Sequence, residues 1–262
     1  MKAMFQRKFM QIIPYRILFA IGCLDMLSIV LNSILPGYWL ITAQSFCESP
    51  LLNLYIGSFT FPSWAAYVGL NVSLSINRLI DFTWPSWEMK LFGGKRIVLW
   101  TGLPTLYGLF LYFFLPPMLY YPGTGGYYFG IEPGKIETPL YYSISDASVA
   151  TIMLLLNLLM IRAMYRRNAA MMTKLQRVIM IQCLGMSVTV LLCAWLYVLM
   201  QIVPMPQFMV TGANLFWILS NGSMMIFYLF VNKAMRKEVQ KILRKHCLLK
   251  VKPKPVYGCE CK

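Results

Sequence analysis

The stretch SWAAYVGLNVSLSINRLIDF, residues 63–82, is apolar or small for most of its length and ends with Asn77, Arg78 and Asp81. Its apolar part belongs to a longer run over residues 54–80. A bilayer core of ~30 Å requires about 20 predominantly apolar residues of helix. The stretch is therefore predicted to be a membrane-spanning helix whose polar end lies at a membrane surface.

The composition of the whole chain also indicates a membrane protein. Of its 262 residues, 58% are hydrophobic and 13% are charged, whereas soluble domains carry about 25% charged residues. The sequence has a single histidine, His246, and it contains no zinc-ligand spacing, phosphate-binding loop or Ser/His/Asp set. Histidine-based catalysis or metal binding has almost no residues to rely on, and no cofactor is expected.

Five further apolar runs bring the number of predicted spans to six. Polar or Pro- and Gly-rich segments separate the runs, and none alternates with the period of two that strands require. The predicted fold class is all-α: a polytopic bundle over 17–231, a basic segment at 1–16, and an amphipathic surface helix with a disordered tail at 232–262. The six spans are predicted at residues 17–42, 54–80, 97–119, 143–163, 178–203 and 208–231.

The basic residues fall almost entirely on one side of the predicted membrane. Of the 24 Lys and Arg, 23 lie on the side of the two termini, and Lys135 alone lies on the other. Lys and Arg are enriched in cytoplasmic loops. Both termini are therefore predicted to be cytoplasmic, and the net charge of +15 is attributed to an anionic inner leaflet rather than to nucleic acid.

Four stretches, in order along the chain, resemble the nematode serpentine chemoreceptors, most closely class T of these seven-helix G-protein-coupled receptors. They are FAIGCLDMLSIVLNSILPGYW (19–39), INRLIDFTWPSW (76–87), FGGKRIVLWTGLPTLYGLF (92–110) and NGSMMIFYLFVNKAMRKEV (221–239). The resemblance covers most of the chain. It implies a chemosensory receptor in the plasma membrane of sensory cells that binds a small chemical ligand and signals through a heterotrimeric G protein.

The same resemblance makes the span at 54–80 the third helix of the seven and the span at 17–42 the second. The first helix is then expected to be lacking, which agrees with the cytoplasmic N-terminus that the charges predict. Two origins fit this expectation: a natural six-span variant, or a gene model that has lost its first exon.

The Asn77-Arg78 pair stands where rhodopsin-like receptors have their Asp-Arg-Tyr switch. Carried over from the resemblance, Arg78 contacts the G protein or holds the bundle inactive. The expected G-protein face consists of Arg78 with three basic residues of the loop between the fourth and fifth spans: Arg166, Arg167 and Lys174. On the residues alone, the alternative is that Arg78 only marks the end of a span.

Polar residues inside the spans form a second candidate site. A charge at mid-bilayer costs ~2.5–3.5 kcal/mol on insertion scales, so Asp25 is not expected to face lipid. At ~1.5 Å per residue, Asp25, Asn71 and Asn221 lie at similar depth and can meet between three helices. With Asn77 and Arg78 they form a candidate switch, and Asp25 is a candidate for a weak sodium site. The alternative is that these groups only hold the helices together.

Candidate ligand contacts lie in the outer or middle parts of the spans: Trp64, Asp146, Trp195, Gln201, Asn214 and Trp217. Aromatic side chains with a few polar groups are typical of small-molecule pockets. An aromatic belt at the membrane surface accounts for the tryptophans equally well. For Asp146, an N-cap at the start of the span at 143–163 is preferred to a ligand contact.

The tail after the last span is predicted to form an amphipathic helix on the inner leaflet. Residues 233–245 place Met235, Val239, Ile242 and Leu243 on one face, with basic residues around it. Cys247 follows at the interface and is a candidate for palmitoylation, with an unmodified cysteine as the alternative.

Two functions of different classes fit these patterns. The preferred one is the receptor. The other is a six-span transporter or channel subunit, which an even number of spans favours, although there is no repeat between 17–119 and 143–231 and no run of intramembrane charges. A membrane enzyme would have to rely on Asp25, Asp146 and a few amides, so no enzymatic activity is predicted.

Overall fold

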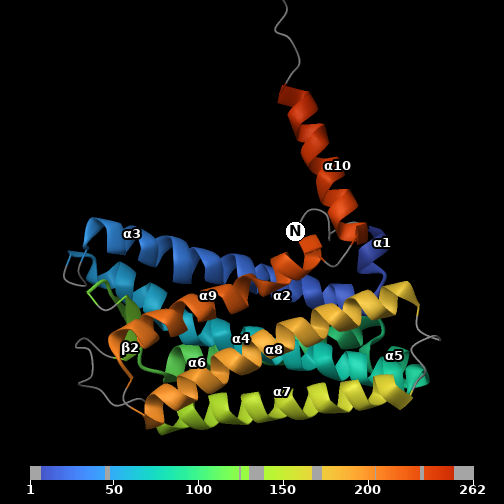
Figure 1. Cartoon of the computed structure of the whole chain (residues 1–262), viewed down its shortest axis with the longest axis horizontal. Coiled ribbons are helices and arrows are strands. Elements are labelled where there is room, and N and C mark those ends of the chain that lie inside the picture. Colours follow the sequence, from blue (N-terminus) through green and yellow to red (C-terminus); the bar gives the residue numbers. More distant parts are fainter. Residues whose placement is uncertain are drawn as a thin grey trace, which may run out of the picture.

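Long helices account for nearly all of the structure, which is a computed structural model and describes residues 7–44, 48–123, 125–129, 139–166, 173–203, 205–230 and 233–250. The helices lie side by side along one direction (Figure 1). In chain order the elements are α1 (Arg7–Met10), α2 (Ile13–Ile29), the π-helix η1 (Val30–Ile34), α3 (Leu35–Thr42), α4 (Pro50–Thr83), α5 (Pro85–Phe92), the 3-10 helix η3 (Gly94–Arg96), α6 (Ile97–Phe114), β1 (Met118–Tyr121), β2 (Gly126–Phe129), α7 (Leu140–Arg166), α8 (Lys174–Ile202), α9 (Gln207–Phe230) and α10 (Lys233–Lys250).

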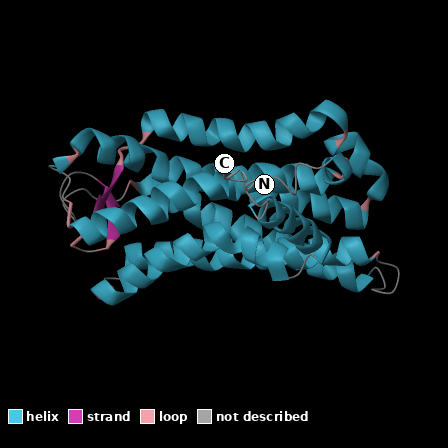
Figure 2. Ribbon diagram, turned by 90° about the horizontal axis from the view of Figure 1, so that it is seen from above, coloured by secondary structure: helices cyan, strands magenta, loops and turns pink. Residues whose placement is uncertain are grey.

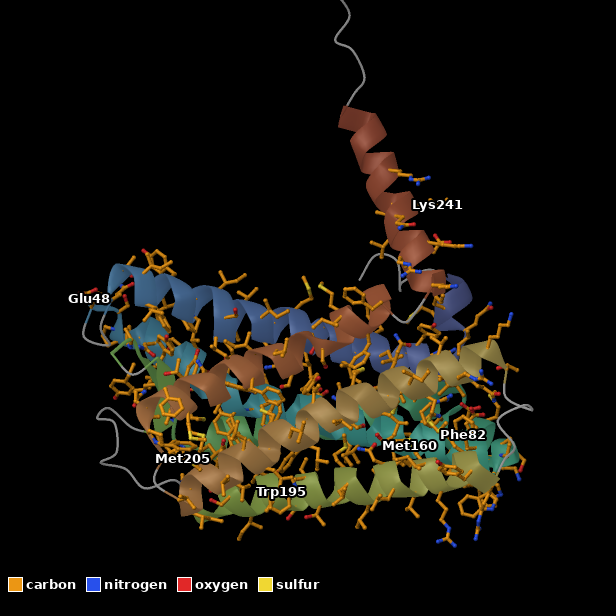
Figure 3. All side chains as sticks on the ribbon, in the orientation of Figure 1. Glu48, Phe82, Met160, Trp195, Met205 and Lys241 are labelled. Atoms are coloured by element: carbon orange, nitrogen blue, oxygen red, sulfur yellow. The ribbon has the colours of Figure 1, made fainter. Side chains whose placement is uncertain are left out.

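The bundle has two distinct ends. The strands β1 and β2 lie at one end, here called the hairpin end (Figure 2), and α5 lies at the other, here called the α5 end (Figure 1). Glu48 and Phe82 mark these opposite ends (Figure 3). The helix α10 leaves the bundle near α1 and runs across the direction of the other helices (Figure 1).

The helix α4 is the centre of the bundle, because it packs against α2, α6, α7, α8 and β1. It runs for 34 residues and ends at Thr83, just before Trp84 and Pro85. Many of its small polar side chains are buried against neighbouring helices, among them Thr60, Ser75 and Asn77. A helix enclosed in this way can carry polar residues that a lipid-facing helix cannot.

Four described segments are long and apolar enough, by length and composition, to cross a membrane: 13–42, 94–114, 141–166 and 176–202. In α6 the apolar side chains are largely exposed, for example Leu103 and Phe113, as expected of a surface that faces lipid. The two helices α6 and α4 approach each other closely at Gly108. A Cβ there would lie 2.6 Å from the carbonyl oxygen of Pro62 and 3.0 Å from the Cβ of Ala66.

The first long segment contains the π-helical turn η1 between α2 and α3. Pro36 follows this turn in α3, and because proline has no N–H it cannot complete the regular hydrogen-bond pattern. Asn32, inside the turn, is buried and its Oδ1 accepts a bond from Thr60 Oγ1 at 3.4 Å. The irregular turn thus directs a polar group toward α4, as is common for π-bulges.

One segment departs from the all-α prediction. The helix expected over 97–119 ends at Phe114, since Pro116 and Pro117 cannot continue it. The chain then forms an antiparallel pair in which Met118 faces Phe129 and Tyr121 faces Gly126. The other predicted spans coincide with helices whose limits differ by a few residues, and the predicted tail beyond residue 250 lies outside the described residues.

Candidate functional site

Arg78 is the centre of a polar network at the α5 end. Its side chain is 3% exposed. Its Nη1 bonds to Asp81 Oδ2 at 3.0 Å and its Nη2 to Glu88 Oε1, on α5, at 3.0 Å. Nη2 also donates to Asn77 Oδ1 at 2.6 Å. One buried guanidinium is therefore shared between two carboxyl groups and an amide, which links the end of α4 to α5.

The same network reaches α8. Gln176 Nε2 donates a long bond, 3.4 Å, to the Asp81 oxygen that Arg78 also binds. Gln176 Oε1 accepts from the backbone N–H of Thr173, and Thr173 Oγ1 accepts from the N–H of Gln176, both at 3.2 Å. This capping box fixes where α8 begins, so the start of α8 is held against the end of α4.

The network contains one more acidic side chain than basic ones, and Glu88 is the more exposed of the two acids. Arg78 supplies one positive charge, whereas Asp81 and Glu88 supply two carboxyl groups. Burial raises the pKa of Glu88 above its ordinary value, the neighbouring Asp81 raises it further, and Arg78 opposes the shift without cancelling it. The ionised form of Glu88 is therefore less favourable here than it is in water.

A second polar cluster lies in the middle of the bundle, between α2, α4 and α9. Tyr67 is fully buried on α4 and its hydroxyl donates to the Ser220 carbonyl oxygen on α9 at 2.9 Å. Asn71 Nδ2 donates to the Tyr67 carbonyl oxygen. Asp25 and Asn221 are also buried, and the Oδ1 of each has no hydrogen-bond partner among the described residues. Within the described part of the chain, no three His, Cys, Asp or Glu side chains are grouped so that they could hold a metal ion.

A small cavity with a free volume of about 10 Å³ lies at the hairpin end. It is lined by Phe61, Trp64, Met118, Tyr142, Asp146, Tyr197 and Trp217. Trp64 Nε1 donates to Asp146 Oδ1 at 3.4 Å. The Trp64 and Trp217 rings meet edge to face, with centroids 6.2 Å apart. The cavity is thus an aromatic enclosure with one carboxyl group, contributed by α4, α7, α8, α9 and β1.

The β1–β2 hairpin covers this cavity and is attached to three helices. Asn214 Nδ2 on α9 donates to the Gly125 carbonyl oxygen at 3.1 Å, and the Tyr127 hydroxyl donates to the Leu31 carbonyl oxygen in η1, also at 3.1 Å. Burial raises the pKa of Tyr127, which keeps this donor protonated. At Gly57 on α4 a Cβ would lie 2.2 Å from the Met118 carbonyl oxygen, so only glycine permits this approach.

Comparison with known proteins identifies the family to which the chain belongs. Residues 1–251 match the family described as serpentine type 7TM GPCR chemoreceptor Srt. The chain is a member of this Srt family. Serpentine receptor class T-55 of Caenorhabditis elegans is 24% identical over 243 residues, which cover 88% of this chain and 65% of that relative. The resemblance to class T is confirmed. The Srt family is one of multi-pass membrane receptors rather than enzymes. The chain spans 65% of the length of this relative.

In the structure of this Srt member, three of the six predicted ligand contacts line the cavity and three do not. Trp64, Asp146 and Trp217 line the cavity, whereas Asn214 holds the hairpin. Gln201 accepts a hydrogen bond from Ser143. The remaining one, Trp195, is 48% exposed on α8 (Figure 3) and does not line the cavity.

The preferred interpretation of Asp146 as an N-cap is wrong. The helix α7 begins at Leu140, so Asp146 lies in its second turn, where its carboxyl group is 4% exposed and bonds to Trp64. The error came from a helix start placed three residues too late. Had α7 been extended to Leu140, a carboxyl group inside a span would have indicated a functional position.

The polar residues predicted at the inner ends fall into two places. Asn77 and Arg78 belong to the network at the α5 end, and Asp25, Asn71 and Asn221 lie among the helices around Tyr67. Of the predicted G-protein face, Arg166 and Lys174 are exposed at facing ends of α7 and α8. Arg167 lies outside the described residues, and Cys247 lies in α10 with a side chain that the structure does not describe.

Sequence reasoning missed three residues that the sites depend on. Glu88 follows Arg78 by ten residues, between the spans predicted at 54–80 and 97–119, and the sequence alone does not pair the two. Gln176 is part of a Thr-x-x-Gln capping box, which the sequence does display. Tyr67 gave no signal, because an aromatic residue in an apolar run is normally core.

Proposed function

We propose that this chain is a G-protein-coupled chemosensory receptor, or the larger part of one. A small ligand in the cavity at the hairpin end shifts a two-state bundle, and the α5 end opens to a heterotrimeric G protein. Membership of the Srt family supports the receptor over a six-span transporter or channel subunit. Among the described residues, the buried charged side chains are only Asp25, Arg78, Asp81 and Asp146, too few and too scattered for an ion path.

The observation that carries the proposal is the buried contact of Arg78 with Asp81, together with the bond from Asp81 to Gln176. It joins α4 to the first turn of α8, and it breaks if the start of α8 moves away. A packed contact of this kind has two discrete states rather than a continuous range. The closed contact is the inactive state of the proposed receptor, and Arg78 is the group that the G protein meets when the contact opens.

The helix order of the seven-helix pattern supports the same proposal. We take α2–α3 as the second helix, α4 as the third, α6 as the fourth, α7 as the fifth, α8 as the sixth and α9 as the seventh, so that α4 and α9 also cross the membrane. The hairpin end is then outside the cell and the α5 end is in the cytoplasm, in the plasma membrane of sensory cells. This orientation places the exposed Arg166 and Lys174 where a G protein can reach them.

The tail fits the same orientation. In α10, Val239 and Ile242 pack against the core of the bundle, while Lys237 and Lys241 are exposed. A basic amphipathic helix that runs across the bundle direction (Figure 1) suits the surface of an anionic inner leaflet. Palmitoylation of Cys247 would add a second attachment to it.

Basal nucleotide exchange tests the proposal without a ligand. The chain is expressed in membranes with heterotrimeric G proteins of each main class, and GTP analogue binding is measured for wild type, Asp81→Asn and Arg78→Ala. We expect Asp81→Asn to raise basal exchange about tenfold, since a hydrogen bond between charged groups is worth about 1.5–3 kcal/mol. Arg78→Ala should reduce exchange to background.

Glu88→Gln is the matched control, because it neutralises the other carboxyl group on the same arginine. Glu88 bonds to Arg78 and Asn77, both on α4, whereas Asp81 also bonds to Gln176 on α8. Neutralisation of Glu88 should therefore raise basal exchange much less than Asp81→Asn does. Equal exchange from all four proteins with every G protein, or a rise with Glu88→Gln as large as with Asp81→Asn, would refute the proposed role of the Arg78–Asp81–Gln176 contact.

A further inference from the structure

We infer that the cavity at the hairpin end binds a small organic cation, an amine or quaternary ammonium group, between the Asp146 carboxylate and the rings of Trp64, Tyr142 and Trp217. This inference names the ligand class of the receptor proposed above, and in that sense it rests on the proposed function. The binding chemistry itself depends only on the cavity.

The first support is the state of the Asp146 carboxyl group. It is 4% exposed, and its hydrogen-bond donors are neutral, the Trp64 indole at 3.4 Å and the Tyr142 hydroxyl. Arg78, with its two ion pairs, lies at the opposite end of the bundle, and no described cationic side chain acts on Asp146. A buried carboxylate without a counter-ion is unfavourable by several kcal/mol, so a site built this way gains when a ligand brings positive charge.

The second support is the nature of the walls. Four of the lining side chains besides Asp146 are Trp or Tyr, and Phe61 adds a fifth ring. The Phe61 and Tyr142 rings are 4.5 Å apart and those of Tyr197 and Trp217 are 6.2 Å apart. Aromatic enclosures attract ammonium groups through their ring faces, tryptophan most strongly, and the attraction grows when water is excluded.

The third support is an unused donor. Trp217 is 6% exposed, lines the cavity, and its Nε1 has no hydrogen-bond partner in the described part of the chain. Buried donors are normally paired. A hydroxyl or carbonyl oxygen on the ligand would pair with this N–H, so the cation that fits best also carries an oxygen acceptor.

The size of the cavity restricts the ligand further. Its free volume is about 10 Å³, which is room for about one water-sized group, so the rings that line it must move apart before an organic cation enters. Met118 of the hairpin forms part of its wall. A cation with few heavy atoms requires a small displacement of these rings, whereas a long lipid or a peptide requires a much larger one.

Choline and 3,3-dimethylbutan-1-ol are suitable probes, because they share shape and hydroxyl group and differ only in the charge. The purified full chain is placed in bilayer discs of phosphatidylglycerol and phosphatidylethanolamine, which carry no choline. Tryptophan fluorescence and the thermal unfolding midpoint are followed during titration. We expect saturable binding of choline, and binding of the neutral alcohol at least about tenfold weaker.

Variants locate the binding. Asp146→Asn and Trp217→Leu should each weaken choline binding about tenfold or more. Trp195→Leu is the matched control: Trp195 is exposed on α8 away from the cavity, and its replacement should leave the affinity unchanged. If Asp146→Asn does not fold, Trp217→Phe keeps a ring in place and should still weaken binding several-fold, because tryptophan is the stronger partner of a cation.

Three results would overturn the inference: no saturable binding of choline by the folded chain, binding of the neutral alcohol as strong as that of choline, or choline binding that is unchanged in Trp217→Leu and in every folded variant at Asp146. The binding assay contains no G protein, and the exchange assay with Asp81→Asn contains no ligand. Failure of the ligand class and failure of the receptor mechanism can therefore be told apart.

Discussion

At the scale of single residues, the network around Arg78 contains two acidic side chains, Asp81 and Glu88, that form different contacts. Asp81 bonds both to Arg78 and to the first turn of α8, so it connects two helices. Glu88 bonds to Arg78 and Asn77 from α5 and is more exposed, at 19% of its side chain against 11% for Asp81. Asp81 therefore forms the contact between α4 and α8, and Glu88 is the group whose raised pKa makes stability depend on pH.

The raised pKa of Glu88 predicts how stability depends on pH. The folded protein binds the Glu88 proton more tightly than the unfolded chain does, so this group contributes stability that is full below the ordinary glutamate pKa and is lost as pH rises through the raised pKa. The thermal unfolding midpoint of wild type minus that of Glu88→Gln should therefore increase on acidification across that window. Thermal scans of both proteins between pH 4 and pH 8 measure this difference, and a decrease on acidification would contradict the assignment.

At the scale of elements, α4 explains why hydropathy alone underestimates this bundle. It is the most enclosed long helix, yet it is not among the segments that length and apolar composition select as spans. Its buried Ser, Thr and Asn side chains bond within the helix or to neighbours, as Ser73 does to the Trp100 carbonyl oxygen on α6. The apolar run at 54–80 could be predicted from sequence. Which of its polar groups pair with other helices could not, because those pairings depend on partners remote in sequence.

The close contact of α4 and α6 gives a prediction with an internal control. Gly108→Ala would press a methyl group against the Pro62 carbonyl oxygen and Ala66, and overpacking of this kind costs about 1–3 kcal/mol. Gly102→Ala, on the same helix, meets nothing within 4 Å and should be neutral or stabilising by up to about 1 kcal/mol. Unfolding midpoints in detergent measure both, and equal midpoints would show that α6 does not approach α4 as described.

The hairpin was the element that sequence reasoning missed, although its signals were present. Aromatic residues at 118–121 and 126–129 flank a Pro- and Gly-rich turn, which is a hairpin pattern. The segment was instead divided between the end of a span and a loop. Gly125, with φ of +64°, shows why the turn favours glycine. What the sequence does not display is where the hairpin attaches, since Leu31, Asn53 and Asn214 come from three separate helices.

The attachment of the hairpin can be tested at Tyr127. Tyr127→Phe removes the hydrogen bond to the Leu31 carbonyl oxygen and leaves the ring, at a cost of about 1 kcal/mol. The amides of 118–129 should then exchange with deuterium about fivefold faster, while those of α4 do not change. Tyr55→Phe, on a side chain that is 61% exposed, is the control. Unchanged exchange in the hairpin of Tyr127→Phe would show that the bond does not hold it.

At the scale of the whole molecule, the sequence was sufficient for the order of the long helices, because apolar length and charge asymmetry are local quantities. Membership of the Srt family was predicted from the resemblance of four stretches rather than from these quantities, and it is confirmed. The sequence was less sufficient for the sites. Three of the six predicted ligand contacts line the cavity, while Asn214 and Gln201 form hydrogen bonds with Gly125 and Ser143. Trp195 is exposed, because in a membrane bundle both sides of a helix are apolar and periodicity does not distinguish the interior from the lipid. Unlike α10, long helices of the bundle such as α2, α7 and α8 have weak amphipathic character, and their side-chain directions then depend on packing.

The proposed ligand site at the hairpin end and the proposed G-protein contact at the α5 end both depend on the orientation of the molecule in the membrane. In a chain whose seven native cysteines are replaced by alanine, a single cysteine is introduced either as Glu48→Cys at the hairpin end or as Lys95→Cys at the α5 end; both positions are exposed. Because basic residues remain in the cytoplasm, a membrane-impermeant maleimide should label Glu48→Cys on intact cells and Lys95→Cys only after permeabilisation. Labelling of Lys95→Cys on intact cells would place Arg78 and its contact with α8 outside the cell, where no G protein could meet them, whereas the cation site would then face the cytoplasm.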